Sequence, residues 1–189
     1  MNTLIIIAHP NPTSFSHAIA TRYREACEKK WHTTDILDLY RTELTMDFLR
    51  FHNQSELKAP NATREALQAK ITKADELVFI FPVWWINMPA ILKNFFDTVL
   101  TPWFAYKYRK WSMFPEKLLT SKKARIFCTC DAIGAMYWLI GNPLRIILQV
   151  GTLGWCGIRV KSYTVFDQMR KTTDIDREKM LSKVSRMAS

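Results

Sequence analysis

Three short segments of the chain each follow an apolar run, and the first, residues 9–16, carries the chemistry of an anion site. It reads HPNPTSFS, and its hydroxyl groups stand where a helix can begin, at Thr13, Ser14 and Ser16. A helix N-terminus offers N–H groups without internal acceptors and the positive end of the helix dipole, which together attract an anion. His9 and His17 would add hydrogen-bond donors. The plainer interpretation is a proline turn followed by ordinary N-capping, and this segment alone does not decide between the two.

The second segment, residues 82–89, reads PVWWINMP and suits a planar ligand. Aromatic rings and main-chain groups can hold a heteroaromatic ring by stacking and hydrogen bonding. Tryptophans more often belong to the core, but Trp84 and Trp85 are adjacent at the end of an apolar run and cannot both easily face inward. The third segment, residues 129–134, offers polar groups after another apolar run. An anion site, an aromatic platform and a polar wall together outline a pocket for flavin mononucleotide.

The elements that would position these segments alternate along the chain. Continuous apolar or β-branched runs predict five strands, at residues 3–8, 33–39, 76–81, 123–130 and 158–166. Helical spacing predicts helices at residues 15–30, 61–72, 89–100 and 173–186, and residues 136–155 are apolar and partly helical. This alternation predicts an α/β fold, a doubly wound five-stranded parallel sheet with helices on both faces. Such sheets bind ligands at the carboxyl ends of their strands, where all three segments lie.

Composition sets broad limits on the function. A chain of 189 residues suits a single domain, and 48% hydrophobic residues exclude a disordered or fibrous protein. Lys and Arg number 27 against 17 Asp and Glu, which gives a net charge of +10 and favours phosphate-bearing partners. Nucleic-acid binding ranks last, because it rests on this charge alone and no recognisable module accompanies it.

Cysteine spacing and the N-terminus indicate the compartment. The four cysteines form no C-x-x-C pair, and Cys128 and Cys130 are wrongly spaced for the usual zinc or redox sites. We therefore expect no metal site and buried free thiols in a reducing compartment. The N-terminal apolar run is too short for a signal peptide, and the sequence predicts no membrane span. The expected location is the cytoplasm.

Four motifs give the chain a resemblance to a known family. They are AHPNPTSFSHA at 8–18, FPVWWINMPAILKNFFDTVL at 81–100, WFAYKY at 103–108 and SKKARIFCTCDAIGAMY at 121–137. On these motifs the chain resembles the flavodoxin-like NAD(P)H:quinone oxidoreductases, which include the DT-diaphorase enzymes and the bacterial potassium-efflux ancillary proteins. The resemblance implies a homodimeric flavoprotein that transfers a hydride from NAD(P)H through flavin N5 to quinones or similar electrophiles, by a ping-pong mechanism. FMN is favoured over FAD, and NADH versus NADPH stays open.

The resemblance also implies site residues, carried over position by position. Those at the flavin phosphate and ribityl chain are His9, Phe15, Ser16 and Ala18. Those along the flavin ring are Pro82, Val83, Trp84, Trp85 and Ile86, and those at its polar edge are Thr129, Cys130, Asp131 and Ala132. The resemblance places Tyr106 and Tyr108 on the substrate side, reaching into the partner's pocket. Tyr137 matches the catalytic tyrosine that hydrogen-bonds the flavin.

The chain departs from the family pattern in two places. Thr129-Cys130-Asp131-Ala132 replaces Thr-Thr-Gly-Gly at the polar edge, where side chains can push the ring away. Pro143 stands near the position of the histidine that partners the tyrosine in animal quinone reductases. Asp131 would lower the flavin's reduction potential if it faces the ring, or it turns outward and caps the next helix. The departures leave a second interpretation open, a regulatory or binding protein that keeps the fold but acts on a protein partner.

Overall fold

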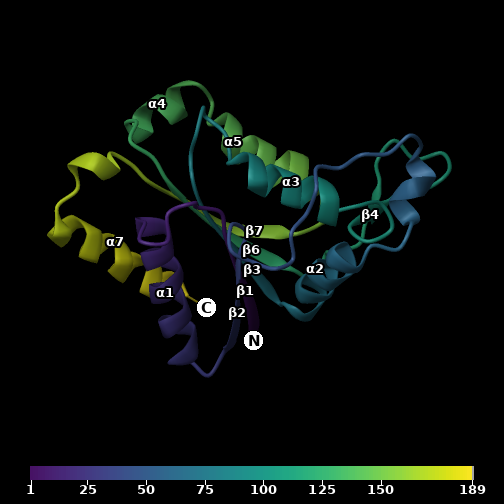
Figure 1. Ribbon diagram of the computed structural model, residues 1–189. Coiled ribbons are helices and arrows are strands. Elements are labelled where there is room, and N and C mark those ends of the chain that lie inside the picture. The colour runs from purple at the N-terminus through teal and green to yellow at the C-terminus, as the bar shows by residue number, and fades with distance from the viewer. Residues whose placement is uncertain (189) are drawn as a thin grey trace.

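The computed structural model describes residues 1–188, and within this range five parallel strands form the central sheet (Figure 1). Their order across the sheet is β2-β1-β3-β6-β7. The strands are β1 (Asn2–Ile7), β2 (Thr33–Asp38), β3 (Glu76–Pro82), β6 (Lys123–Thr129) and β7 (Arg159–Phe166). The chain reverses its direction across the sheet between β1 and β3, so their carboxyl ends flank the switch point, the usual ligand position in this topology. The predicted doubly wound parallel sheet is confirmed.

Helices cover both faces of the sheet (Figure 1). One face carries α1 (Phe15–Glu28) and α7 (Asp174–Met187), which also contact each other. The other face carries α2 (Ala62–Lys73), α3 (Ala90–Val99) and the segment α5 (Pro143–Ile146), η2 (Ile147–Thr152) and α6 (Leu153–Cys156). The remaining short elements are η1 (Gln54–Lys58), β4 (Tyr106–Lys107), β5 (Glu116–Lys117), α4 (Gly134–Leu139) and η3 (Met169–Lys171).

The two-sided covering explains the uninterrupted apolar runs of the central strands. Along β1, Leu4 and Ile6 pack with the helices of one face, while Ile5 and Ile7 pack against α1 and α7 on the other. All residues of β3 are buried, as a strand covered on both faces requires. Burial of alternate residues in two separate cores fixes the register of β1 against β3, with Ile7 beside Ile80.

Local signals set the ends of the helices close to the predicted residues. Ser14 is the N-cap residue of α1, and Asn61 caps α2 by accepting a hydrogen bond from the Arg64 N–H at 2.8 Å. The predicted helix at 15–30 ends at Glu28, two residues early. The apolar stretch 136–155 is broken into α4, α5, a π-helical turn and α6. Among the described residues, no helix is both long and apolar enough to cross a membrane.

Candidate functional site

The carboxyl ends of β1, β3 and β6 open into one cavity of about 360 Å³. All three segments contribute to its wall, as the sequence predicted. Eight of the lining residues come from the first and third segments: His9, Thr13, Ser14, Phe15, Ser16, Thr129, Cys130 and Asp131. The second segment contributes Pro82, Val83 and Trp84, and the chain beyond β7 contributes Met169 and Arg177.

The first turn of α1 lines this cavity and has the features of an anion site. The N–H groups of His17 and Ala18 donate to the Ser14 carbonyl at 3.0 and 3.2 Å, while those of Phe15 and Ser16 come before the first internal acceptors of the helix. The turn contains no acidic residue, so the positive end of the helix dipole is not neutralised. Ala18 takes part only through this backbone bond and does not line the cavity.

The Ser16 hydroxyl gives a second, independent sign that a polar ligand belongs here. Ser16 is only 1% exposed and lines the cavity, and its Oγ has no hydrogen-bond partner among the described residues. A buried hydroxyl without a partner is costly, so the site calls for a ligand oxygen that this hydroxyl can contact. A phosphate or ribityl oxygen meets that requirement, and the cradle therefore fits a flavin.

His9 is fixed as a neutral donor on the cavity wall. Its Nδ1 accepts a hydrogen bond from the Asn11 N–H at 3.1 Å. Burial, more than any other influence, holds the pKa of His9 below its ordinary value. A neutral imidazole that accepts at Nδ1 carries its proton on Nε2, so this atom is available as a hydrogen-bond donor.

The C-terminal helix supplies a cation that the sequence did not single out. Arg177 lies one turn into α7 and lines the cavity, with its Nε donating to the Thr172 hydroxyl at 3.2 Å. Met169, in η3, lines the wall beside it. In sequence both residues belong to a polar tail remote from the three predicted segments. Only the packing of α7 against α1 reveals their position.

The second segment forms a tight turn in which Trp84 lines the cavity and Trp85 is exposed to solvent. Trp84 and Asn87 exchange two backbone hydrogen bonds of 2.9 Å, and Trp84 lines the cavity. Trp85 and Ile86 sit at the tip with φ of 52° and 61°, a left-handed conformation that β-branched and bulky residues rarely adopt. Trp85 is 99% exposed. The cavity of this chain therefore contains Trp84 of the predicted ring platform but neither Trp85 nor Ile86.

Asp131 lines the cavity and is held by the segment after β7. Its carboxylate accepts a hydrogen bond from the Arg170 N–H at 3.1 Å and pairs with the Arg170 guanidinium at 2.9 Å. At the start of helix α4, it is Asp167 rather than Asp131 that accepts a hydrogen bond, from the Gly134 N–H at 2.7 Å. The interpretation of Asp131 as the cap of the next helix is thus wrong, because Asp167 occupies that role. Ala132 does not line the cavity.

Tyr137 contacts Cys130, which is part of the cavity wall. Its hydroxyl hydrogen-bonds the Cys130 thiol, and burial followed by this contact raises the pKa of Tyr137. Cys130 is buried, its thiol donates to the Ala132 carbonyl at 3.5 Å, and burial raises its pKa to about 11. Both groups are therefore protonated at neutral pH. Cys130 lines the cavity, whereas Tyr137 contacts Cys130 and is not itself among the lining residues.

Tyr106 and Tyr108 lie elsewhere. Their rings meet edge to face at 5.7 Å and line a second cavity of about 920 Å³, together with Trp103 and Trp155. Within one chain, the structure does not bring the two predicted substrate residues to the cavity of the three segments. Tyr108 is 64% exposed, so its ring is free to contact a neighbouring molecule.

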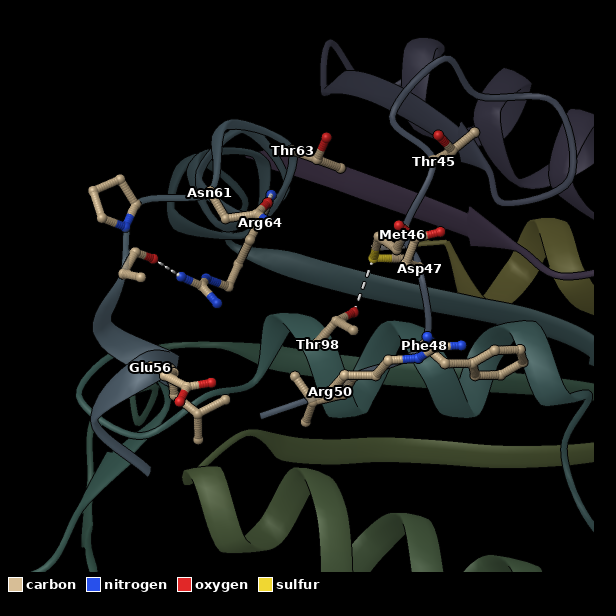
Figure 2. Close-up of a pocket in the computed structure, with 14 residues that line it drawn as sticks. Thr45, Met46, Asp47, Phe48, Arg50, Glu56, Asn61, Thr63, Arg64 and Thr98 are labelled. Carbon is tan, nitrogen blue, oxygen red and sulfur yellow. Dashed lines mark hydrogen bonds between the residues drawn. The ribbon is translucent and has the colours of Figure 1, made fainter. Parts of the chain in front are cut away.

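A third cavity, of about 440 Å³, lies between the segment after β2 and helices α2 and α3 (Figure 2). The Thr98 hydroxyl on α3 contacts Met46 Sδ at 3.0 Å, and the Arg64 guanidinium donates to the Ala59 carbonyl (Figure 2). These bonds tie the irregular segment onto the helices. None of the predicted site residues lines this cavity.

Comparison with known proteins shows which family the chain resembles along its length. The family model for the flavodoxin-like fold matches residues 1–188. The chain is 34% identical to NAD(P)H dehydrogenase [quinone] 1 of Cavia porcellus over 83% of its own length and 65% of the relative's. It is 30% identical to an uncharacterised NAD(P)H oxidoreductase of Haemophilus influenzae, over 96% of this chain and 91% of that one. The chain thus spans just under two thirds of the length of the guinea pig relative.

A solved structure matches along the whole chain. The crystal structure of Smu.1420 from Streptococcus mutans superposes with a TM-score of 0.86 at 36% identity. The match covers 100% of this chain and 98% of that one.

Proposed function

The chain belongs to the flavodoxin-like family that contains these NAD(P)H oxidoreductases, and we propose that it is a flavin-dependent enzyme that reduces quinones or similar electrophiles with NAD(P)H. We further propose that residues 1–189 act as one flavin-binding domain. One observation carries the proposal most directly. The buried, unpartnered Ser16 hydroxyl and the first turn of α1 share a cavity with Trp84, so a phosphate site and an aromatic ring lie within reach of one ligand.

Each side of the cavity has a role toward a bound flavin. The N–H groups of α1 and the Ser16 hydroxyl would bind the phosphate and ribityl oxygens, with Arg177 adding a positive charge. Trp84 and Val83 would hold the ring, and Thr129 and Asp131 would face its polar edge. FMN is the proposed cofactor, because its phosphate and its ring match the helix N-terminus and the aromatic side chain that share this cavity.

The chemistry that a bound flavin supplies is hydride transfer in two half-reactions, from NAD(P)H and then to the acceptor. The protein residues provide orientation and hydrogen bonds. Tyr137 keeps a protonated hydroxyl at neutral pH because its pKa is raised, so this hydroxyl can donate a hydrogen bond toward charge that develops nearby. No residue is required to act as a nucleophile.

The acceptor site is proposed to lie between two copies of the chain. Tyr106 and Tyr108 line a different cavity from the flavin residues, and Tyr108 is exposed. In a homodimer, each copy would offer these tyrosines to the flavin cavity of the other. The proposed substrate is a small planar electrophile, since aromatic side chains would enclose it.

The visible absorption spectrum of the protein, mixed with FMN or FAD and freed of excess, tests the function. We expect bound FMN whose absorption bleaches on addition of NADH or NADPH and returns on addition of a quinone. Failure to retain either flavin would overturn the proposal and favour the regulatory alternative.

A further inference from the structure

We infer that His17 is a positioning residue that draws the Ser14 hydroxyl away from the N-terminus of α1 and thereby keeps the first-turn N–H groups open for the flavin phosphate. The inference rests on the proposed flavin function and concerns how this chain prepares its phosphate cradle.

A continuous chain of hydrogen bonds holds His17. Arg41 Nη1 donates to Asp38 Oδ2 at 2.8 Å, and His17 Nε2 lies 2.9 Å from the same carboxylate oxygen. The Tyr40 N–H donates to the other oxygen of Asp38 at 3.0 Å. On the far side of the ring, His17 Nδ1 lies 3.0 Å from Ser14 Oγ. The side chains of His17 and Asp38 are 18% and 16% exposed, so solvent screens this chain only in part.

The charge of Asp38 sets the direction of the bond between His17 and Asp38. Burial by itself would raise its pKa, but the hydrogen bonds from His17 and Arg41 outweigh burial and hold the pKa below its ordinary value. Asp38 is therefore ionised and can only accept, which places a proton on His17 Nε2. Nδ1 of a neutral ring accepts from the Ser14 hydroxyl and Nδ1 of a protonated ring donates to the Ser14 oxygen, so His17 holds the Ser14 side chain in either state.

This arrangement removes the side-chain oxygen that usually competes with an anion for the first-turn N–H groups of a helix. A serine at the N-cap normally turns its oxygen onto an N–H group of the first turn. Ser14 is the N-cap of α1, yet its side chain makes no such capping bond. Its hydroxyl is bonded to His17 instead. The N–H groups that a cap would occupy are the ones that the phosphate needs.

The test compares FMN with riboflavin, which lacks the phosphate, by quenching of flavin fluorescence. His17→Phe should weaken FMN binding about fivefold, since an N-cap bond worth roughly 1 kcal/mol would then compete. Riboflavin binding should not change. Ser14→Ala removes the competing hydroxyl, so adding it to His17→Phe should restore FMN affinity. His52→Phe, at an exposed histidine, is the matched control. His17→Ala repeats the measurement if the phenylalanine variant does not fold.

Three results would overturn the inference. Equal loss of FMN and riboflavin affinity would indicate that His17 supports the fold alone. Failure of Ser14→Ala to restore FMN affinity would exclude action through Ser14. If the wild-type protein bound FMN and riboflavin equally, the phosphate would not be bound at α1, although the flavin function would stand. Binding of neither flavin would overturn the proposed function and this inference together.

Discussion

The carboxylate of Asp131 lies 2.9 Å from the guanidinium of Arg170, and this ion pair joins the end of β6 to the segment that follows β7. Asp131 lines the cavity, whereas the side chain of Arg170 is 87% exposed. The Asp131 carboxylate thus places a negative charge at the proposed polar edge of the flavin, and Arg170 neutralises part of it. Because both side chains are substantially exposed, salt screens their effect.

Replacing Asp131 should raise the flavin reduction potential. A nearby carboxylate disfavours an anionic reduced ring, so Asp131→Asn relieves that effect, while Arg170→Ala should lower the potential by leaving the carboxylate unpaired. Equilibration with dyes of known potential measures both shifts, which should shrink as salt is added. Asp35→Asn, at an exposed carboxylate that pairs with Lys70 and lines neither cavity, is the control. An unchanged potential in Asp131→Asn would show that this carboxylate does not act on the ring.

Replacing Ser16 should change affinity and stability in opposite directions. Its hydroxyl is buried without a protein partner, so Ser16→Ala should leave the flavin-free protein as stable or more stable by roughly 1 kcal/mol. The variant should bind FMN about tenfold more weakly, because a hydrogen bond to a charged group is worth roughly 1.5–3 kcal/mol. Urea denaturation and flavin titration measure the two effects. Ser185→Ala, at a hydroxyl bonded within α7, is the control, and unchanged FMN affinity in Ser16→Ala would remove Ser16 from the site.

A buried network at the other end of the sheet should affect stability alone. The Tyr23 hydroxyl donates to Glu76 at 2.6 Å, and Arg125 pairs with the same carboxylate at 2.9 Å. Tyr23→Phe removes one donor from a carboxylate that is 0% exposed, and should lower the free energy of unfolding by roughly 1–3 kcal/mol. Flavin affinity should not change, because Glu76 begins β3 and the cavity lies at its end. Tyr40→Phe, at an exposed tyrosine, serves for comparison.

Tyr137 should matter for turnover without setting a pH limit in the neutral range. Its pKa is raised above the ordinary value of about 10, so the hydroxyl keeps its proton at every pH below that value. We expect kcat with a quinone to show no ionisation from this residue between about pH 6 and 9. Tyr137→Phe should lower kcat about tenfold or more with little change in FMN affinity. A wild-type kcat in this variant would exclude the proposed role.

Mixed dimers test whether Tyr106 and Tyr108 act on the partner's cavity. A variant with both tyrosines changed to Ala should bind FMN normally but reduce quinones poorly, and Ser16→Ala combined with Trp84→Ala should fail at the flavin site. Mixing the two inactive proteins should restore activity, because one site of each mixed dimer then has all its residues intact. Absence of recovery, with mixed dimers detected by native mass spectrometry, would place the tyrosines outside the partner's site.

Local sequence patterns determined most of the fold and the position of the site. The apolar runs of β1 and β3 predict strands covered on both faces, and the segments that follow them must lie at the carboxyl edge of the sheet. The start of α1 is also local, since Pro10 and Pro12 exclude a helix before it and Ser14 stands at the N-cap position. These features depend on residues a few positions apart, so a sequence pattern contains them.

Only the tertiary structure decided which side chains meet. Arg177 reaches the cavity because α7 packs on α1, and His17 meets Asp38 because β2 lies beside β1. Trp85 turns to solvent because the tight turn after β3 directs only Trp84 into the cavity. Each of these outcomes depends on packing between distant segments or on the handedness of one turn. Hydrophobic periodicity reports which face of an element is buried, but it does not identify the side chain that will lie opposite.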